Sequence, residues 1–375
     1  MKKLSSLGIA AIAVAALIGA GTSPAQADDV AHHHHVTTPT VLAKGLVTPL
    51  RLAANGDGSV VVAQEFAGML TRVARNGAKT TIYSAPGWDV GGVSISDGKT
   101  YFVQSQGAGG MDGKPLAGFL KSIDKHGKVR QIANIAAYIK AARPGKNVTF
   151  GFRDLKATCL AQVPAQIPGS YKQELDSHPY ATDEHDGTIY IADAGANAIL
   201  KVNEWTGHVS TAALLPGRPI AITKALAAGM HLPTCAIGHK YYLEPVPTDV
   251  QRGHDGWLYV TSLPGGPEDG SLGANGSVFK VNPWNGQVRV VARHLAGASG
   301  LALARNGDIY VAELFAGRIS VIRHCSDDAR PFLAVKAPGD VEIRGGTLYA
   351  TIAVVDPTNP AAPPAGQVIK VSLER

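Results

Sequence analysis

The stretch Gly307-Asp308-Ile309-Tyr310-Val311-Ala312-Glu313 sets the architecture, because related stretches recur along the whole chain. Each copy opens with a glycine, usually after Asp or Asn, which suits the positive φ of a hairpin turn. Each copy then continues as a strand rich in β-branched and aromatic residues. The other five copies are Gly58–Gln64, Gly98–Gln104, Gly187–Asp193, Gly256–Ser262 and Gly346–Ile352.

Further strands surround each copy. A short apolar strand precedes every glycine, and these strands open at Pro49, Val90, Pro179, Pro247, Ala298 and Pro338. A third strand follows each copy, and a turn such as Asn285-Gly286 then leads to a fourth. The unit is a four-stranded antiparallel meander, so the predicted fold is all-β, a six-bladed β-propeller.

The two ends of the chain complement each other. The sixth repeat stops after its third strand at Val371, and the stretch 41–46 precedes the first repeat as an extra strand. Pairing of this N-terminal strand with the last blade would close the ring and remove two exposed edges.

The first 27 residues are typical of a secretory signal peptide. Two lysines are followed by an apolar run and by a small-residue cleavage signal, which places the cut between Ala27 and Asp28. No second apolar segment is long enough to span a membrane. We therefore expect a secreted, extracellular protein without a membrane span.

The mature chain divides into a tail and a propeller. Residues 28–40 are expected to form a flexible tail that contains His32 to His35, and residues 41–375 the propeller. Adjacent histidines on such a tail can bind a metal loosely, but they do not form a closed site. Insertions at about 134–177 and 217–245 interrupt the repeat on either side of its third copy. Loops on a rigid scaffold often carry binding sites, although a disulfide-tied cap is an equally simple interpretation.

The insertions also contain helical patterns and cysteines. The apolar spacing predicts helices at 134–140 and 221–230. Export to an oxidising compartment favours a disulfide, and we expect Cys159 to pair with Cys235 rather than either with Cys325, since a staple serves long loops best. Cys325 is then expected to be a buried, inert thiol.

The composition restricts the partners. The chain has 375 residues, 45% of them hydrophobic, and a net charge of +6, but no run of Lys or Arg follows the leader. We therefore expect no nucleic acid and no cofactor, and a monomer whose partner is an unknown small molecule or extracellular protein.

One column of residues points to a site on the propeller axis. The first strand of each blade lines the central channel, and its third position is occupied by Arg51, Gly92, Ala181, Asp249, Gly300 and Asp340. Arg51 can simply neutralise Asp249 and Asp340, because buried charges are normally paired. The alternative is a polar pocket for a small ligand or a metal, although a guanidinium competes with Ca²⁺. The scattered histidines, His178 among them, are expected to be mostly solvated.

Several motifs resemble the ScyD/ScyE family of secreted proteins, which are six-bladed NHL/TolB-like propellers. The resemblance rests on Asp176–Tyr180, Ala192–Asn197, Glu244–Val250, Ser262–Glu268 and Val311–Phe315, and it extends over nearly all of 41–375. It implies the fold and secretion but brings no catalytic residues. The wider six-bladed group includes metal-dependent lactonases, whose metal cages use several acidic and amide side chains around the axis.

Two functions follow from this reading. The first is an extracellular binding or scaffold protein, with the insertions around the third repeat as its recognition face. The second is a metal-dependent hydrolase or lactonase that uses the central channel, with Asp249 and Asp340 as its acids. No catalytic residue and no metal ligand is assigned from the sequence, and metal storage by His32 to His35 is a third, weaker hypothesis.

Overall fold

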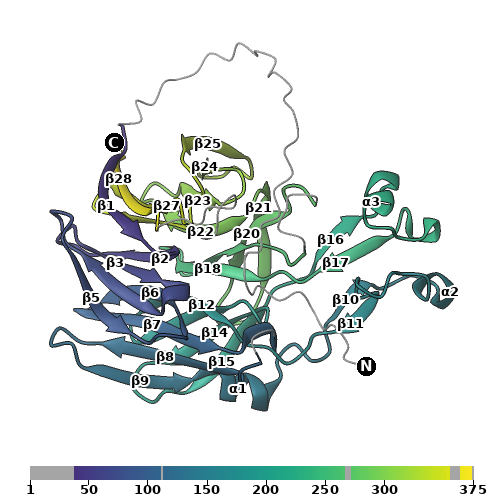
Figure 1. The fold of residues 1–375 in the computed structure, drawn as a ribbon, viewed down its shortest axis with the longest axis horizontal. Coiled ribbons are helices and arrows are strands. Elements are labelled where there is room, and N and C mark those ends of the chain that lie inside the picture. Colours follow the sequence, from purple (N-terminus) through teal and green to yellow (C-terminus); the bar gives the residue numbers. More distant parts are fainter. Residues whose placement is uncertain (1–37, 111–112, 267–271, 355–363, 374–375) are drawn as a thin grey trace, which may run out of the picture.

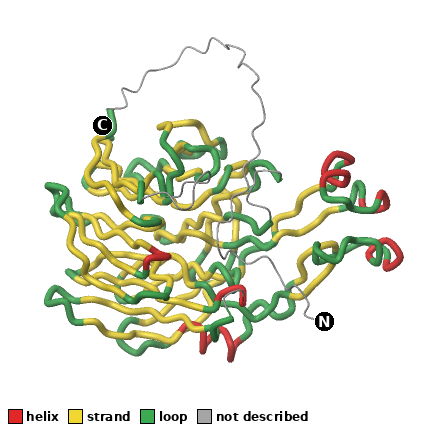
Figure 2. The backbone as a smooth tube through the Cα atoms, viewed as in Figure 1, coloured by secondary structure: helices red, strands yellow, loops and turns green. Residues whose placement is uncertain are grey.

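The computed structural model describes residues 38–110, 113–266, 272–354 and 364–373. The predicted signal peptide, its cleavage site between Ala27 and Asp28, and His32 to His35 lie outside the described residues. Within the described part, strands dominate and helices are short (Figures 1 and 2). This confirms the all-β class predicted from the sequence.

Five of the repeats fold as consecutive four-stranded antiparallel sheets, as their hairpin pattern predicts. The first sheet contains β2 (Pro49–Ala54), β3 (Val60–Gln64), β4 (Met69–Val73) and β5 (Lys79–Ser84). The second contains β6 (Asp89–Ser96), β7 (Lys99–Gln106), β8 (Ala117–Ile123) and β9 (Val129–Asn134). The third contains β12 (Pro179–His185), β13 (Thr188–Asp193), β14 (Ala198–Asn203) and β15 (Val209–Leu214). The fourth contains β18 (Pro247–Arg252), β19 (Leu258–Ser262), β20 (Gly276–Val281) and β21 (Val288–Leu295). The fifth contains β22 (Ala298–Leu303), β23 (Ile309–Glu313), β24 (Arg318–Ile322) and β25 (Ala329–Ala334).

The sixth sheet joins the two ends of the chain. It contains β26 (Asp340–Arg344), β27 (Thr347–Ile352), β28 (Gly366–Ser372) and β1 (Thr40–Leu46). β1 pairs antiparallel with β28, with Thr40 opposite Lys370 and Leu46 opposite Gly366. The N-terminal strand therefore occupies the position of the missing fourth strand, as predicted.

Apolar side chains hold successive sheets together. Val61 and Leu70 of the first sheet share a buried cluster with Phe102 of the second, and equivalent clusters join each later pair. A further cluster contains Val62 of the first sheet and Val368 of the sixth. The first strands of neighbouring sheets also contact one another, and β26 contacts β2. The sheets thus pack face to face, with their first strands innermost.

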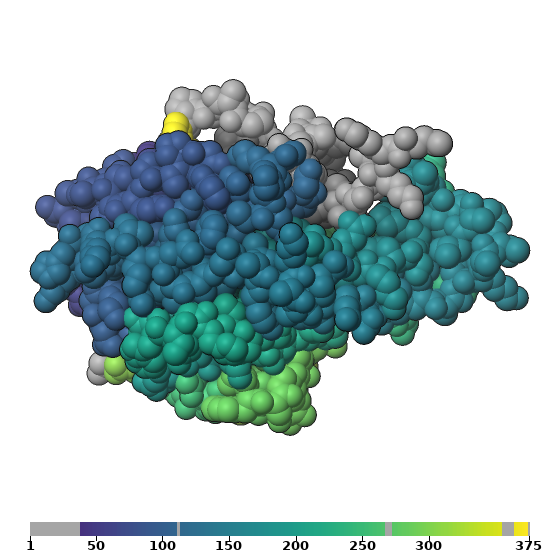
Figure 3. All heavy atoms as spheres, turned by 90° about the horizontal axis from the view of Figure 1, so that it is seen from below, coloured from purple at the N-terminus to yellow at the C-terminus, as the bar shows by residue number. Residues whose placement is uncertain are grey.

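The two insertions form a seventh sheet that projects from the main body (Figure 1). Its strands, in spatial order, are β11 (Ser170–Lys172), β10 (Thr149–Phe152), β17 (Lys240–Leu243) and β16 (Arg218–Ala221). Seen from below, the teal residues of this projection reach past the rest of the molecule (Figure 3). The segments lie together as expected, but they pair as strands where the sequence predicted only loops and helices.

The projection has its own small core and a disulfide. Phe152, Ile222 and Leu232 are buried there beside the two cysteines of the bond between Cys159 and Cys235, which confirms the predicted pairing. The short α2 (Ala157–Leu160) and α3 (Lys224–Gly229) lie at its outer end, together with the 3-10 turn η3 (Thr234–Ala236) (Figure 2). The two insertions therefore form a small core of their own, which the disulfide cross-links.

Both predicted helices exist, with shifted starts. α1 (Ile135–Ala142) begins after Asn134, whose side chain accepts a hydrogen bond from the backbone N–H of Ala137. α3 begins later than predicted, because Thr223 caps it and the residues before are already in β16.

The prediction for Cys325 is wrong, because this thiol is exposed. It lies in the turn after β24, outside the strands that bury their side chains. Among the described helices, none has the length and apolar character needed to cross a membrane.

Candidate functional site

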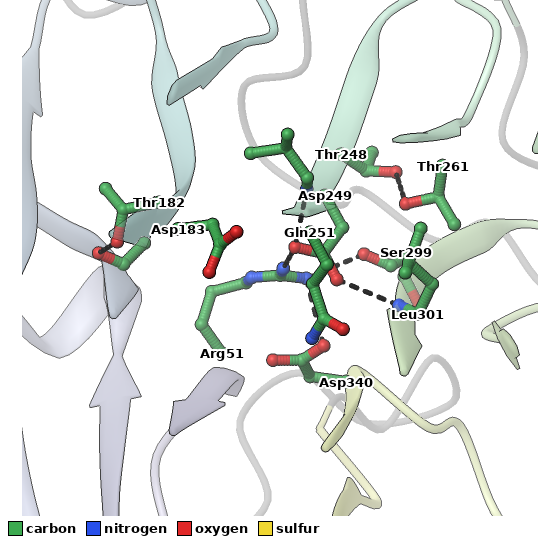
Figure 4. A network of polar contacts seen from close by, with 12 residues as sticks. Arg51, Thr182, Asp183, Thr248, Asp249, Gln251, Thr261, Ser299, Leu301 and Asp340 are labelled. Carbon is green, nitrogen blue, oxygen red and sulfur yellow. Dashed lines mark hydrogen bonds and ion pairs between the residues drawn. The ribbon is translucent and has the colours of Figure 1, made fainter. Parts of the chain in front are cut away.

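The structure brings the predicted axial residues together. Arg51 on β2 forms ion pairs with Asp249 on β18 and with Asp340 on β26, the latter at 3.3 Å (Figure 4). All three side chains are almost fully buried. Arg51 also donates a hydrogen bond to the carbonyl oxygen of Ser299 at 2.8 Å. The guanidinium is therefore surrounded by acceptors from three other strands.

The two carboxylates also tie neighbouring first strands together. Asp249 accepts a hydrogen bond from the backbone N–H of Leu301 on β22 at 2.8 Å. Asp340 accepts one from the N–H of Leu52 on β2 at 2.9 Å. Because the first strands of neighbouring sheets do not pair with each other, these side chains supply the hydrogen bonds between them. Arg51, Asp249 and Asp340 therefore have a structural role, because they connect the first strands of neighbouring sheets.

Small residues in the same column leave room for the charged ones. A side chain at Gly300 would collide with the carboxylate of Asp340. Gly92 has a φ of +43° and lies against the backbone of Ala181, where a Cβ would approach to 3.0 Å. The space between the first strands is therefore filled by side chains and backbone at the third position of each strand.

A second layer of polar residues, which the sequence reading missed, lies two positions further along the same strands. Asp183 accepts a hydrogen bond from the N–H of Arg252 at 2.7 Å, and Gln251 donates one to Glu342 at 3.0 Å. These three side chains are only half-buried, so they keep some contact with solvent. Their signal was available, because the alternation of a strand places positions three and five on one face.

The carboxyl groups of these two polar layers have raised pKa values. The pKa of Asp183 is raised to about 7, mainly by burial; the hydrogen bond from the N–H of Arg252 opposes the rise, and repulsion from Asp249 and Glu184 adds to it. Burial, followed by repulsion from Asp340, Asp249 and Asp183, raises the pKa of Glu342 well above its ordinary value. Burial likewise raises the pKa of Asp249 and Asp340, and Arg51 opposes that rise. One guanidinium thus lies among four carboxyl groups, and burial raises the pKa of all four.

A second ionisable cluster lies next to the projecting sheet, where β3 ends and where β6 and β12 begin. The imidazole of His178 is 5% exposed, and its Nε2 lies 3.4 Å from Glu65 and 3.9 Å from Asp89. Burial alone would lower the pKa of His178, but Glu65, Asp89 and Asp176 together raise it to about 9. The expectation of a solvated His178 is therefore wrong. Its partners come from two other sheets, which no local sequence pattern reveals.

A pocket of about 100 Å³ opens beside His178, between the projecting sheet and the loops at the strand ends. Its lining consists of Ala108, Pro168, Tyr171, Glu174, Asp176, His178, Ala194, Gly195, Tyr241, Leu243, Glu244, Val246, Gly265 and Gly266. Glu244 accepts hydrogen bonds from the hydroxyl of Tyr171 at 3.0 Å and from the side-chain amide of Asn197 at 2.6 Å. Burial raises the pKa of both Glu244 and Asp176. The pocket thus combines carboxyl groups, an imidazole and two tyrosines from two separate parts of the fold.

Neither cluster has the geometry of a metal cage. Among the residues that the structure describes, no three His, Cys, Asp or Glu side chains are grouped so that they could hold a metal ion. At the axis, Arg51 occupies the space between the two carboxylates that a cation would need (Figure 4).

Comparison of the sequence with known protein families and with curated proteins gives no match. Solved structures do match. Aldose sugar dehydrogenase from Streptomyces coelicolor in its PQQ-bound form shares 14% identity, with a TM-score of 0.53 over 90% of this chain and 98% of that one. The apo form of the aldose sugar dehydrogenase from Escherichia coli shares 11% identity, with a TM-score of 0.53 over 90% and 99%. Virginiamycin B lyase from Staphylococcus aureus shares 14% identity, with a TM-score of 0.50 over 90% and 99%.

These neighbours are β-propeller proteins, so the fold of this chain is propeller-like. At such low identity the likeness concerns the fold alone, and the function has to be argued from the sites.

Proposed function

We propose that the protein is a secreted, six-bladed β-propeller that acts as an extracellular binding protein. Six repeat sheets with clusters between each successive pair, including the sixth and the first, support a ring of six blades. The pairing of β1 with β28 supports its closure. The disulfide between Cys159 and Cys235 supports an oxidising compartment.

The observation that carries the binding role is the pocket under the projecting sheet. A separately packed sheet covers the strand-end loops there, and a buried His178 forms part of the wall. Its volume of about 100 Å³ suits one small group of a larger partner rather than a whole cofactor. Glu174, Asp176 and Glu244 outnumber the single imidazole, so a basic or hydrogen-bond-donating group is favoured.

A thermal-shift screen of amines, sugars and basic peptides would test this role. Compounds that stabilise the wild type should lose their effect in Glu244→Gln and Asp176→Asn. They should keep it in Asp327→Asn, because Asp327 is an exposed carboxylate outside the pocket. Ligands that stabilise all four proteins equally would show that the pocket is not the binding site.

A second candidate function is a hydrolase or lactonase-like enzyme of the central channel. It is favoured by one feature, namely that Asp183 and Glu342 lie in the same polar layer with raised pKa values and keep some contact with solvent. Groups of this kind can act as general acids. Arg51, Asp249 and Asp340 would then shape the channel floor.

Turnover of lactones and esters, with and without Ca²⁺, would separate the two functions. Activity that disappears in a folded Glu342→Gln or Asp249→Asn protein would favour the enzyme. Absence of turnover together with specific ligand stabilisation would favour the binding protein.

We also propose membership of the ScyD/ScyE family. Four of the motifs that carry this resemblance contribute to one place. Asp176, Glu244 and Gly265 line the pocket, and Asn197 donates a hydrogen bond to Glu244. A common binding site is a physical reason for such motifs to occur together, and it connects the family proposal with the proposed pocket.

A further inference from the structure

A second hollow lies where the first and sixth sheets meet, beside the turn between β2 and β3 and the turn between β26 and β27. Its volume is about 440 Å³, within the range of small-molecule sites. Its lining includes the cations Arg75, Arg344 and Lys370 and the hydroxyl groups of Thr40, Thr347 and Tyr349. It therefore combines three cations with several hydroxyl groups, and it exists because the two ends of the chain pair in the sixth sheet.

Among the residues that the structure describes, no carboxylate pairs with these three cations. Arg75, Arg344 and Lys370 form no ion pair or hydrogen bond with any residue that the structure describes. The one carboxylate among the described lining residues, Asp57, already pairs with Arg72 at 3.0 Å. Asp57 also accepts hydrogen bonds from the N–H and the hydroxyl of Ser59. The described lining therefore has more cations than carboxylates.

These groups converge on one side of the hairpin turn between β2 and β3. The Cδ of Arg75 and the hydroxyl of Tyr349 lie 3.6 and 3.8 Å from the Cβ position of Gly58. The Nη2 of Arg344 lies 3.9 Å from the Cβ position of Gly56. Lys370 lies directly opposite Tyr349 across the ladder of β27 and β28. Because Gly56 and Gly58 have no side chains, the turn between β2 and β3 leaves space for a ligand. Cationic and hydroxyl groups from the first and sixth sheets lie around that space.

We propose that this hollow binds an anionic sugar ester, a polyol that carries a phosphate or sulfate group. Arginine and lysine side chains recognise tetrahedral oxyanions through charge-assisted hydrogen bonds. The hydroxyl groups of Thr40, Thr347 and Tyr349 match the remaining polyol hydroxyls. The volume holds a sugar ring in addition to the oxyanion, whereas an inorganic anion alone would leave most of it empty. The site is separate from the pocket under the projecting sheet, so it does not depend on the function proposed above.

Titration calorimetry at low salt with glucose 6-phosphate, glucose 6-sulfate, inorganic phosphate and glucose tests the proposal. At least one ester should bind, with an affinity that falls as salt rises, and glucose should not. Arg75→Gln and Arg344→Gln should each weaken the ester by about tenfold. The ester that binds more tightly identifies the kind of oxyanion.

Two further variants keep the test decisive. Arg305→Gln is the matched control, because Arg305 is an exposed arginine in another hairpin turn, outside the hollow and without a partner among the described residues. It should leave affinity unchanged. Asp57→Asn removes the only carboxylate of the hollow's described lining and should tighten binding. The proposal is overturned if neither ester binds, if inorganic phosphate binds as tightly as the esters, or if the Arg305 variant loses as much affinity as the others.

Discussion

Arg51 is a buried cation, and its contribution to stability depends on its two partners. Breaking a buried ion pair leaves uncompensated charge, which costs far more than losing an exposed pair. We expect Arg51→Met to lower the free energy of unfolding by about 3–5 kcal/mol, as measured by denaturant titration. Arg72→Ala, which removes an exposed partner of Asp57, should cost less than about 1 kcal/mol.

A double variant tests the cause. Adding Asp340→Asn to Arg51→Met removes one of the carboxylates left without a cation, so it should restore part of the lost stability. If the double variant is less stable than Arg51→Met alone, charge compensation is not what holds these residues together.

His178 makes stability depend on pH in a defined direction. Its pKa rises from an ordinary 6.5 to about 9 in the folded protein, so the folded state binds the proton more tightly. The stabilisation is complete below pH 6.5 and is lost as the pH rises through about 9. The shift corresponds to about 3 kcal/mol.

Unfolding free energies of the wild type and His178→Gln between pH 6 and 10 would measure this effect. The wild type should lose its advantage over the variant across this window, and an imidazole titration by NMR should place the midpoint near 9. A His178 midpoint at or below 6.5 would contradict the assigned ion pair with Glu65.

At the scale of elements, the stability of the projecting sheet depends on its disulfide. The bond between Cys159 and Cys235 spans 76 residues, and closing a loop of that length is worth about 4 kcal/mol on chain-entropy grounds. We expect Cys159→Ser with Cys235→Ser to lower stability by up to that amount and to expose the projecting sheet to limited proteolysis. Cys325→Ser is the control, because this exposed thiol is unpaired, and it should change neither property.

The repeat strands could be predicted from the sequence, and the projecting sheet could not. A stretch such as Gly307–Glu313 follows a turn glycine and presents a regular apolar pattern, so its local sequence specifies a strand. β10, β11, β16 and β17 have three or four residues each, and they pair only because distant segments meet. The same contrast applies to the sites. The column of Arg51, Asp249 and Asp340 follows from aligned repeats, whereas the burial of His178 depends on side chains from other sheets.

At the scale of the whole molecule, the pairing of β1 with β28 holds the first and last parts of the chain together. Deletion of residues 38–46 would expose the edge of β28 and remove Leu46 and Ala43 from the cluster between the sixth and first sheets. We expect a loss of several kcal/mol, seen as a lower thermal midpoint. As a control, a chain that begins at Thr38 keeps β1, so its thermal midpoint should equal that of the chain that begins at Asp28. If the chain without residues 38–46 has the same midpoint as these two, closure by β1 is contradicted.

The outer edges of most repeat sheets carry residues that oppose edge-to-edge pairing. In five of the six repeat sheets the outer edge strand carries a charged residue or a proline, which discourages pairing with another copy, whereas β15 (Val209–Leu214) carries neither. These residues include Lys44, Lys79, Arg130, Arg289 and Pro331.

The place of β1 also fixes the order in which the fold can be completed. β1 leaves the ribosome before any other strand, and its partner β28 is synthesised last. Until then β1 has no neighbour to pair with, and the sixth sheet cannot form. A nascent chain therefore cannot complete the sixth sheet until β28 has been made, whereas the five other repeat sheets consist of strands that follow one another in the sequence.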